Sequence, residues 1–241
     1  MKLSFILPTY NEAGNIGKLI EAIKFQEELK QFSFEFIVVD DDSSDDTQNV
    51  VQKLIKKKWP IELIVRKNAR GLASAILAGI KQAKGDYVII MDTDLTHRPE
   101  DLYRLLEPAQ KEMADLVVGS RYIPGGGMHV TEANNLQYWL SKWGNFIVNR
   151  LIFNFPVHES LSGFIVIKRH ILPTLNLKQI FYGYGEYCIR LIYYCHEKGL
   201  KIKEVPVMYG FRQYGVSKSN LLKMIVNYLT TALKLRFCGL V

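Results

Sequence analysis

Two aspartates directly follow an apolar stretch of the sequence. Tyr87 to Met91 are apolar or aromatic without alternation, which predicts a strand buried on both faces, and Asp92 and Asp94 come next. Residues two apart on an extended chain point to one side, and open α/β sheets bind ligands beyond the carboxyl ends of their strands. Carboxylates suit Mg²⁺ or Mn²⁺, which they bridge to a substrate's phosphates. We therefore expect a divalent-cation site at Asp92 and Asp94.

A second interpretation of the same segment stays open. Asp92 to Leu95 would then only turn the chain and cap the helix that Pro99 and Glu100 begin. The residue types alone do not separate a metal site from a capped turn.

Strand and helix patterns alternate through the first half of the chain, which is typical of βαβ units on a largely parallel sheet. The expected strands are 4–7, 36–39, 61–65 and 87–91, and the expected helices lie around 16–23, 50–55 and 71–83. Polar residues follow each strand: Pro8 to Glu12, then Asp40 to Ser43, then Arg66. Since the carboxyl ends of parallel strands meet at one edge, we expect one crevice to collect them with Asp92 and Asp94.

Acidic residues stand where many nucleotide-binding folds have glycines. No Gly-x-Gly-x-x-Gly follows a strand and no Gly-Lys-Ser/Thr phosphate loop occurs, which disfavours a dinucleotide dehydrogenase and a P-loop enzyme. Asp40 or Asp41 would accept hydrogen bonds from a base or ribose, and a metal would hold the diphosphate against these charges. We expect Asp45, Asp46 and Thr47 to be solvated residues that cap the next helix.

The second half of the chain supplies basic residues for an anion. A strand at 116–118 leads to Arg121, then to a triple glycine (125–127) and an aromatic-rich helix at 135–153. After strands at 164–167 and 202–207, the loop at 209–218 carries Arg212, Ser217 and Lys218, which could close over phosphates. The alternatives are a surface arginine and a basic surface loop. Apolar residues at helical spacing in 221–237, with basic residues beside them, fit either a membrane-interface helix or a packed terminal helix.

Composition limits the class of protein. With 241 residues and 48% hydrophobic content, the chain is long enough for one α/β domain, and its formal charge of +7 favours an anionic partner. We expect no nucleic-acid binding, because residues 40–46 form an acidic run and no nucleic-acid module is present. The sequence shows neither a signal peptide nor a run of 18 uncharged apolar residues, and the three cysteines lack metal or disulfide spacing, so we expect a cytosolic protein.

The motifs together identify a family. In chain order they are Pro8-Thr9-Tyr10-Asn11-Glu12, Val39-Asp40-Asp41-Asp42-Ser43, Asp92-Thr93-Asp94, Gly119-Ser120-Arg121-Tyr122 with the triple glycine, Ser162-Gly163-Phe164, Glu204-Val205-Pro206 and Arg212 to Lys218. This set resembles the family 2 nucleotide-sugar glycosyltransferases of the GT-A fold, and within them the dolichyl- or polyprenyl-phosphate sugar synthases.

The resemblance implies a fold and a division of the chain. It implies an α/β protein with a Rossmann-like, mostly parallel central sheet flanked by helices and a C-terminal amphipathic helix. The single domain would comprise a nucleotide-sugar half (1–118), an acceptor half (119–220) and the terminal helix (221–241). It would work peripherally on the cytosolic face of a membrane, and the sequence leaves open whether membrane spans or a membrane subunit accompany it.

The resemblance also assigns residues. Pro8, Tyr10, Glu12 and Asp41 would hold the nucleotide with Asp40, Asp92 and Ser217 nearby, Asp94 would be the main ligand of Mg²⁺ or Mn²⁺ with Asp92 beside it, and Arg121, Arg212 and Lys218 would gather the donor diphosphate and acceptor phosphate. The sequence departs from the family pattern at Thr96, Gln137, Glu159 and Ile165.

The identity of the acceptor decides the mechanism. A phosphate monoester is already ionised at neutral pH, so transfer of a hexose, mannose in the first instance, from a GDP- or UDP-sugar to a polyprenyl phosphate needs no general base. A saccharide hydroxyl would need one, and Glu186 is the candidate. A non-catalytic nucleotide-sugar-binding scaffold is the third alternative.

Overall fold

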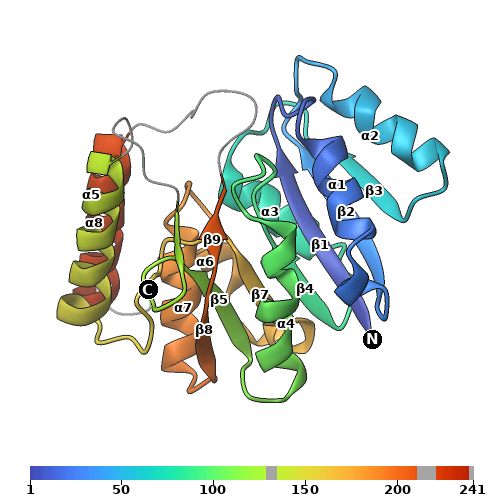
Figure 1. The fold of residues 1–241 in the computed structure, drawn as a ribbon. Helices are drawn as coiled ribbons and strands as arrows, with labels where there is room; N and C mark the ends of the chain where they lie inside the picture. The colour runs from blue at the N-terminus through green and yellow to red at the C-terminus, as the bar shows by residue number, and fades with distance from the viewer. Residues whose placement is uncertain (129–134, 211–220, 239–241) are drawn as a thin grey trace.

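Seven strands form the central sheet of the computed structural model, which describes residues 1–128, 135–210 and 221–238 (Figure 1). Their order across the sheet is β3-β2-β1-β4-β7-β5-β8, and all neighbouring pairs are parallel except the two that involve β7. The strands are β1 (Lys2–Thr9), β2 (Ser33–Asp40), β3 (Ile61–Val65), β4 (Tyr87–Ile90), β5 (Leu116–Ser120), β7 (Ile165–Lys168) and β8 (Ile202–Pro206). The expected α/β fold with a mostly parallel sheet is therefore confirmed.

Helices cover both faces of this sheet. Alternate residues of β1 point to opposite faces: Leu3, Phe5 and Leu7 pack against the helices of one face, and Ile6 packs against those of the other. The first face carries α1 (Ile16–Lys24), α2 (Thr47–Lys56) and α4 (Leu102–Gln110), and the second carries α3 (Leu72–Ile80), α6 (Leu177–Ile180) and α7 (Tyr187–Glu197). The central strands therefore read as continuous apolar runs.

The antiparallel strand β7 brings a distant segment to the ligand edge of the sheet. β7 pairs with β4 so that Ile90 faces Ile165, and the residues just before β7 therefore lie beside those just after β4. A Cβ placed on Gly163 would lie 3.5 Å from Oδ1 of Asp92, which shows how closely the two segments approach. This arrangement explains why Ser162-Gly163-Phe164 accompanies the Asp-Thr-Asp segment.

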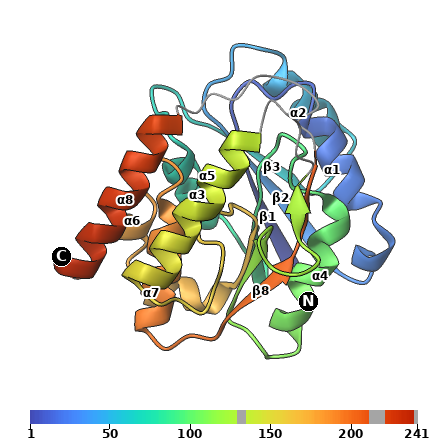
Figure 2. The ribbon, with the colours of Figure 1, turned by 60° about the vertical axis from the view of Figure 1, so that its left-hand side comes forward.

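Two helices stand beside the sheet on its β5 and β8 side (Figures 1 and 2). They are α5 (Asn135–Phe146), which continues into a π-helical segment (Ile147–Ile152), and α8 (Leu221–Cys238). Ala232 of α8 packs in one apolar cluster with Val148 of the π-helical segment and Ile189 of α7, and this cluster anchors the terminal helix to the domain. In the described residues no helix is long and apolar enough to cross a membrane.

A short parallel pair completes the fold. β6 (Gly127–Met128) pairs with β9 (Met208–Tyr209), so the triple glycine meets the strand that precedes residues 211–220. The backbone N–H of Gly210 donates to the carbonyl of Thr96 at 2.8 Å. The end of β9 is thus tied to the loop that carries Asp94.

Candidate active site

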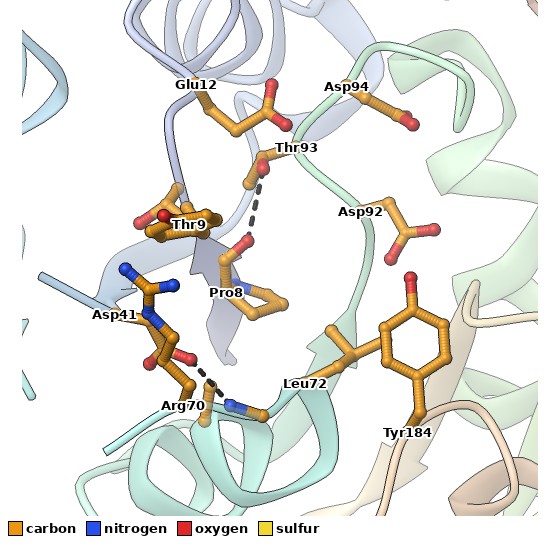
Figure 3. A pocket seen from close by; sticks show the side chains of 13 residues that line it. Pro8, Thr9, Glu12, Asp41, Arg70, Leu72, Asp92, Thr93, Asp94 and Tyr184 are labelled. Atoms are coloured by element: carbon orange, nitrogen blue, oxygen red, sulfur yellow. Dashed lines mark hydrogen bonds between the residues drawn. The ribbon is translucent and has the colours of Figure 1, made fainter. Parts of the chain in front are cut away.

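A pocket of about 370 Å³ opens at the carboxyl ends of β1 and β4 (Figure 3). The strand order reverses between these two strands, which is where open α/β sheets form their binding crevices. The described residues that line the pocket are Pro8, Thr9, Tyr10, Glu12, Asp41, Arg70, Gly71, Leu72, Ala75, Asp92, Thr93, Asp94 and Tyr184. The structure thus brings together six of the predicted site residues: Pro8, Tyr10, Glu12, Asp41, Asp92 and Asp94.

The loop after β4 is shaped by its own hydrogen bonds. The strand ends at Ile90, so Asp92 and Asp94 lie in a loop and not on extended chain. The hydroxyl of Thr93 donates to the carbonyl of Pro8 at 3.1 Å, and Oδ1 of Asp94 accepts the backbone N–H of Thr96 at 3.0 Å and its hydroxyl at 2.6 Å. Thr96 therefore orients the carboxylate that we expect to be the main metal ligand.

His97 holds the loop after β4 in place through both of its ring nitrogens. Its Nδ1 accepts the backbone N–H of Asp92 at 2.9 Å, and its Nε2 lies 2.8 Å from the hydroxyl of Tyr209. The ring is buried and stacks on Phe164, with 4.8 Å between ring centroids. Burial lowers the pKa of His97 to about 4, so the imidazole is neutral at pH 7. No sequence motif marks this histidine, because its partners are a backbone N–H and the distant Tyr209.

Asp41 joins the end of β2 to the start of α3. Oδ2 of Asp41 accepts the backbone N–H of Gly71 at 2.9 Å, and Oδ1 accepts Nε–H of Arg66 at 2.7 Å. Arg66 also donates to Ser74 (2.9 Å) and to the carbonyl of Gly71 (3.1 Å). Gly71 has φ 143°, a conformation that favours glycine. These bonds hold Asp41 at the pocket wall.

Arg70 is a residue that the sequence interpretation missed. Among the described lining residues it is the one with a positive charge, and its guanidinium lies 4.3 Å from the ring centroid of Tyr10. Figure 3 shows Arg70 beside Asp41, across the pocket from Tyr184. The same arginine lines a second hollow with Asp41, Asp42, Arg66, Asn68 and Ala69. This end of the pocket offers a cation, a carboxylate and an aromatic ring together.

Asp40 is placed away from the pocket. It is fully buried, and its carboxylate accepts the backbone N–H of Ser43 at 2.9 Å and the side-chain amide of Gln48 at 2.8 Å. The hydroxyls of Ser43 and Thr9 donate to it as well. Asp40 thus holds the β2–α2 loop in shape, and its predicted contact with a nucleotide stays a prediction.

Asp45 links two loops of the site. Burial would raise the pKa of this carboxyl, but hydrogen bonds from Thr47 and from the backbone N–H of Ala13 outweigh burial and lower it. Asp45 is exposed and accepts the backbone N–H of Thr47 at the start of α2, as expected, and it also ties the loop after β1 to the loop after β2. Thr47 itself is fully buried, so the expectation that it is solvated is wrong.

Arg121 lies outside the pocket lining in a buried ion pair with Glu159. Glu159 is fully buried and accepts the backbone N–H of Arg121 at 2.6 Å and its Nε–H at 2.8 Å. Burial alone would lower the pKa of Arg121, but the carboxylate raises it above its usual value. Its predicted contact with the diphosphate stays a prediction. Arg212, Ser217 and Lys218 lie outside the described residues, as does the side chain of Gln137.

The pocket's carboxylates fit a divalent cation that also binds a substrate phosphate. No group of three or more His, Cys, Asp or Glu residues that could hold a metal ion occurs in the part of the chain that the structure describes. Mg²⁺ and Mn²⁺ are commonly held by one or two carboxylates together with phosphates and waters. Asp92 and Asp94 both line the pocket, where the Asp92 side chain is 41% exposed and Asp94 is 7% exposed. Two aspartates and a diphosphate would complete such a shell.

Comparison with known proteins gives the family. The glycosyl transferase family 2 model matches residues 4–174. The chain belongs to this family and is a glycosyltransferase. The dolichol-phosphate mannosyltransferase of Pyrococcus furiosus is 34% identical over 222 residues, and the match covers 90% of this chain and 59% of that protein. This chain thus spans less than two thirds of that relative's length.

Two further proteins extend the comparison. The polyprenol monophosphomannose synthase of Mycolicibacterium smegmatis is 32% identical over 219 residues, which are 88% of this chain and 79% of that protein. Among solved structures, glucosyl-3-phosphoglycerate synthase of Mycobacterium tuberculosis, in complex with Mn²⁺, UDP and phosphoglyceric acid, has a TM-score of 0.72 at 22% identity and covers 100% of this chain and 79% of its own. The GT-A fold of this glycosyltransferase is thereby confirmed.

Proposed function

We propose that this glycosyltransferase transfers mannose from GDP-mannose to a polyprenyl or dolichyl phosphate, with a divalent cation, at the cytosolic face of a membrane. The observation that carries the proposal is similarity over most of the chain to a dolichol-phosphate mannosyltransferase and a polyprenol monophosphomannose synthase. The pocket supports it, because it gathers Glu12, Asp41, Asp92 and Asp94 at one edge of the sheet.

The pocket supports an arrangement of the donor along its length. The nucleoside would lie at the end formed by Tyr10, Asp41 and Arg70, where a carboxylate and a ring can meet ribose and base. The diphosphate would lie at Asp92 and Asp94. A cation held there by these two carboxylates would neutralise charge on the departing nucleoside diphosphate.

Chemistry at the anomeric carbon then requires little from the protein. An oxygen of the acceptor phosphate attacks the anomeric carbon, the bond from that carbon to the diphosphate oxygen breaks, and the nucleoside diphosphate leaves with the electron pair. Attack from the face opposite the leaving group inverts the configuration. Because the phosphate is already ionised, positioning and charge stabilisation suffice.

The position of Glu186 disfavours a saccharide hydroxyl as acceptor. Glu186 is buried, does not line the pocket, and accepts the backbone N–H of Tyr184 at 2.7 Å. A general base must reach the proton that it abstracts. Glu186 is the candidate base from the sequence, but its position suits it to holding the backbone of Tyr184.

An apolar surface on α5 and α8 supports work at a membrane. Trp139, Trp143 and Phe146 of α5 and Val226, Leu233 and Phe237 of α8 are exposed, Trp143 at 61% and Phe237 at 80%. Lys142 lies 5.2 Å from the ring of Trp139, and Lys234 and Arg236 occupy exposed positions of α8. Exposed aromatic side chains beside basic residues are typical of helices that lie in an anionic membrane surface.

The test is a transfer assay with labelled donors. The protein is incubated with Mn²⁺ and radiolabelled GDP-mannose, UDP-glucose or UDP-N-acetylglucosamine, with either polyprenyl phosphate or free saccharides as acceptor. We expect label in the lipid extract, from GDP-mannose and only with polyprenyl phosphate. Label in saccharides alone, or no transfer from any donor, would contradict the proposal.

A further inference from the structure

Tyr184 is the one described residue of the pocket lining that comes from beyond residue 94. It lies across the pocket from Asp41 and Arg70, with its ring beside Leu72 and its hydroxyl pointing toward Asp92 (Figure 3). The side chain is 42% exposed, so part of its surface faces the open pocket. The second half of the chain thus contributes an aromatic ring and a hydroxyl to the wall next to the aspartates.

We propose that Tyr184 contacts the sugar that is transferred and helps to select it. The proposal rests on the proposed function, which places the nucleoside near Tyr10 and the diphosphate at Asp92 and Asp94. The pocket next to the diphosphate, bounded by Leu72 and Tyr184, is then the place for the sugar. An aromatic ring packs against the C–H face of a sugar, and a phenol hydroxyl exchanges hydrogen bonds with its hydroxyls.

Buried polar contacts hold the backbone that presents Tyr184. Oε2 of Glu186 accepts the Tyr184 N–H, and Arg190 donates through Nε to the carbonyl of Ile180 at 2.8 Å and through Nη2 to the carbonyl of Tyr182. Gly183 has φ 73°, and a Cβ there would lie 3.1 Å from Oε2 of Glu186. Glu186 and Arg190 are therefore positioning residues for Tyr184.

The terminal helix supports this loop from behind. The hydroxyl of Tyr228 in α8 occupies the space beside Gly185, where an added Cβ would lie only 2.3 Å from it. Burial, together with neighbouring groups that include Glu186 and Tyr184, raises the pKa of Tyr228, so this hydroxyl stays protonated. The loop is thus held between α7 and α8, and Tyr184 has a fixed place in the pocket wall.

The experiment separates sugar binding from nucleotide binding. Calorimetry with Mn²⁺ measures the affinities for GDP and for GDP-mannose in wild type, Tyr184→Phe, Tyr184→Ala and Tyr182→Phe. Tyr182→Phe is the matched control, because Tyr182 is exposed on the same loop, does not line the pocket, and keeps the ring over which Arg190 lies. We expect at least one Tyr184 variant to bind GDP-mannose about tenfold more weakly with GDP affinity unchanged, since one hydrogen bond contributes about that factor. The control should bind both ligands as wild type does.

Three results would overturn the inference. The first is wild-type affinity for GDP-mannose in both Tyr184 variants. The second is an equal loss of affinity for GDP and for GDP-mannose, which would mean that Tyr184 acts on the diphosphate, through Asp92, and not on the sugar. The third is failure of the wild type to bind either ligand, which would overturn the proposed donor as well.

The positioning role has its own readout. Glu186→Gln keeps an oxygen that can accept the Tyr184 N–H, whereas Glu186→Ala removes it. We expect the preference for GDP-mannose over GDP to fall in Glu186→Ala and to be retained in Glu186→Gln, with GDP affinity unchanged in both. An unchanged preference in Glu186→Ala would contradict the positioning role.

Discussion

Nδ1 of His97 accepts the backbone N–H of Asp92 at 2.9 Å, and Nε2 of the same ring lies 2.8 Å from the hydroxyl of Tyr209. Because Nδ1 accepts, the ring proton sits on Nε2. One neutral imidazole thus links the loop that carries the two aspartates to β9, whose next residue, Gly210, bonds to Thr96. The loop after β4 and the end of β9 are thus joined by two hydrogen bonds.

This link predicts a loss of stability in mild acid. The folded-state pKa of His97 is lowered to about 4, below its unfolded value near 6.5. Between these two pH values the imidazole is protonated in the unfolded chain and neutral in the folded protein. The contribution of His97 is complete above about pH 6.5 and is lost as the pH falls toward about 4. Between about pH 7.5 and pH 5 we expect the free energy of unfolding to fall by about 2 kcal/mol on account of His97.

Urea unfolding of the metal-free protein at the two pH values measures this loss. His97→Asn, whose side-chain oxygen can still accept the Asp92 N–H, serves as the variant without a titrating group. It should be less stable at neutral pH and should lose less stability on acidification. An identical pH dependence in wild type and variant would contradict the assignment.

The hydroxyl of Thr96 should tune metal binding. Removing it in Thr96→Val leaves Oδ1 of Asp94 without its 2.6 Å hydrogen bond. Loss of a partner that orients a metal ligand typically weakens metal binding about tenfold or more. Titration of Mn²⁺ into the protein with saturating GDP measures the effect, and Thr96→Ser should restore the wild-type value. Equal Mn²⁺ affinity in Thr96→Val and wild type would show that Asp94 needs no such support.

The variant Glu186→Gln distinguishes a phosphate acceptor from a saccharide-hydroxyl acceptor. Since Glu186 lies outside the pocket and bonds to the Tyr184 N–H, Glu186→Gln should retain transfer to polyprenyl phosphate within a few-fold of wild type. The saccharide-hydroxyl alternative predicts complete loss of activity. Transfer rates under saturating donor decide between them, provided that nucleotide binding is intact in the variant.

The apolar surface of α5 and α8 should bind membranes. Replacing Trp143 by Ser removes the side chain that is 61% exposed on α5, and burial of such a ring contributes about 1.5–3 kcal/mol, so we expect about tenfold weaker binding to anionic vesicles. Flotation with phosphatidylglycerol-containing vesicles measures it. Phe25→Ser, which changes a 63% exposed ring at the end of α1, is the matched control and should bind as wild type does. Equal binding of Trp143→Ser and Phe25→Ser to the vesicles would contradict the proposal that the surface of α5 and α8 binds membranes.

Local patterns in the sequence predict the sheet and most of the pocket. Tyr87 to Ile90 of the apolar run form a buried strand as expected, and the residues after β1, β2 and β4 meet because the carboxyl ends of parallel strands share an edge. Helix 221–237 is also present as α8 (Leu221–Cys238). These predictions depend only on the spacing of apolar residues and on residues that are close together in the sequence.

Features that depend on partners far along the chain are not readable in this way. The direction of β7 is decided by its pairing with β4 and β5, not by its four residues. The buried ion pair of Arg121 with Glu159, 38 positions later, cannot be read from the residues around Arg121. Tyr184 reaches the pocket on a loop whose backbone accepts hydrogen bonds from Arg190 and donates one to Glu186. The sequence shows each of these residues but not its partner.

Calorimetric binding of GDP and UDP, each with and without Mn²⁺, to wild type and Asp94→Asn tests the donor site most directly. We expect wild type to bind GDP tightly only with Mn²⁺, and Asp94→Asn to lose this metal-dependent binding while its unfolding free energy stays near the wild-type value. Metal-independent binding of equal strength in both proteins, or no binding of either nucleotide by wild type, would contradict the assignment of the pocket at β1 and β4 as the donor site.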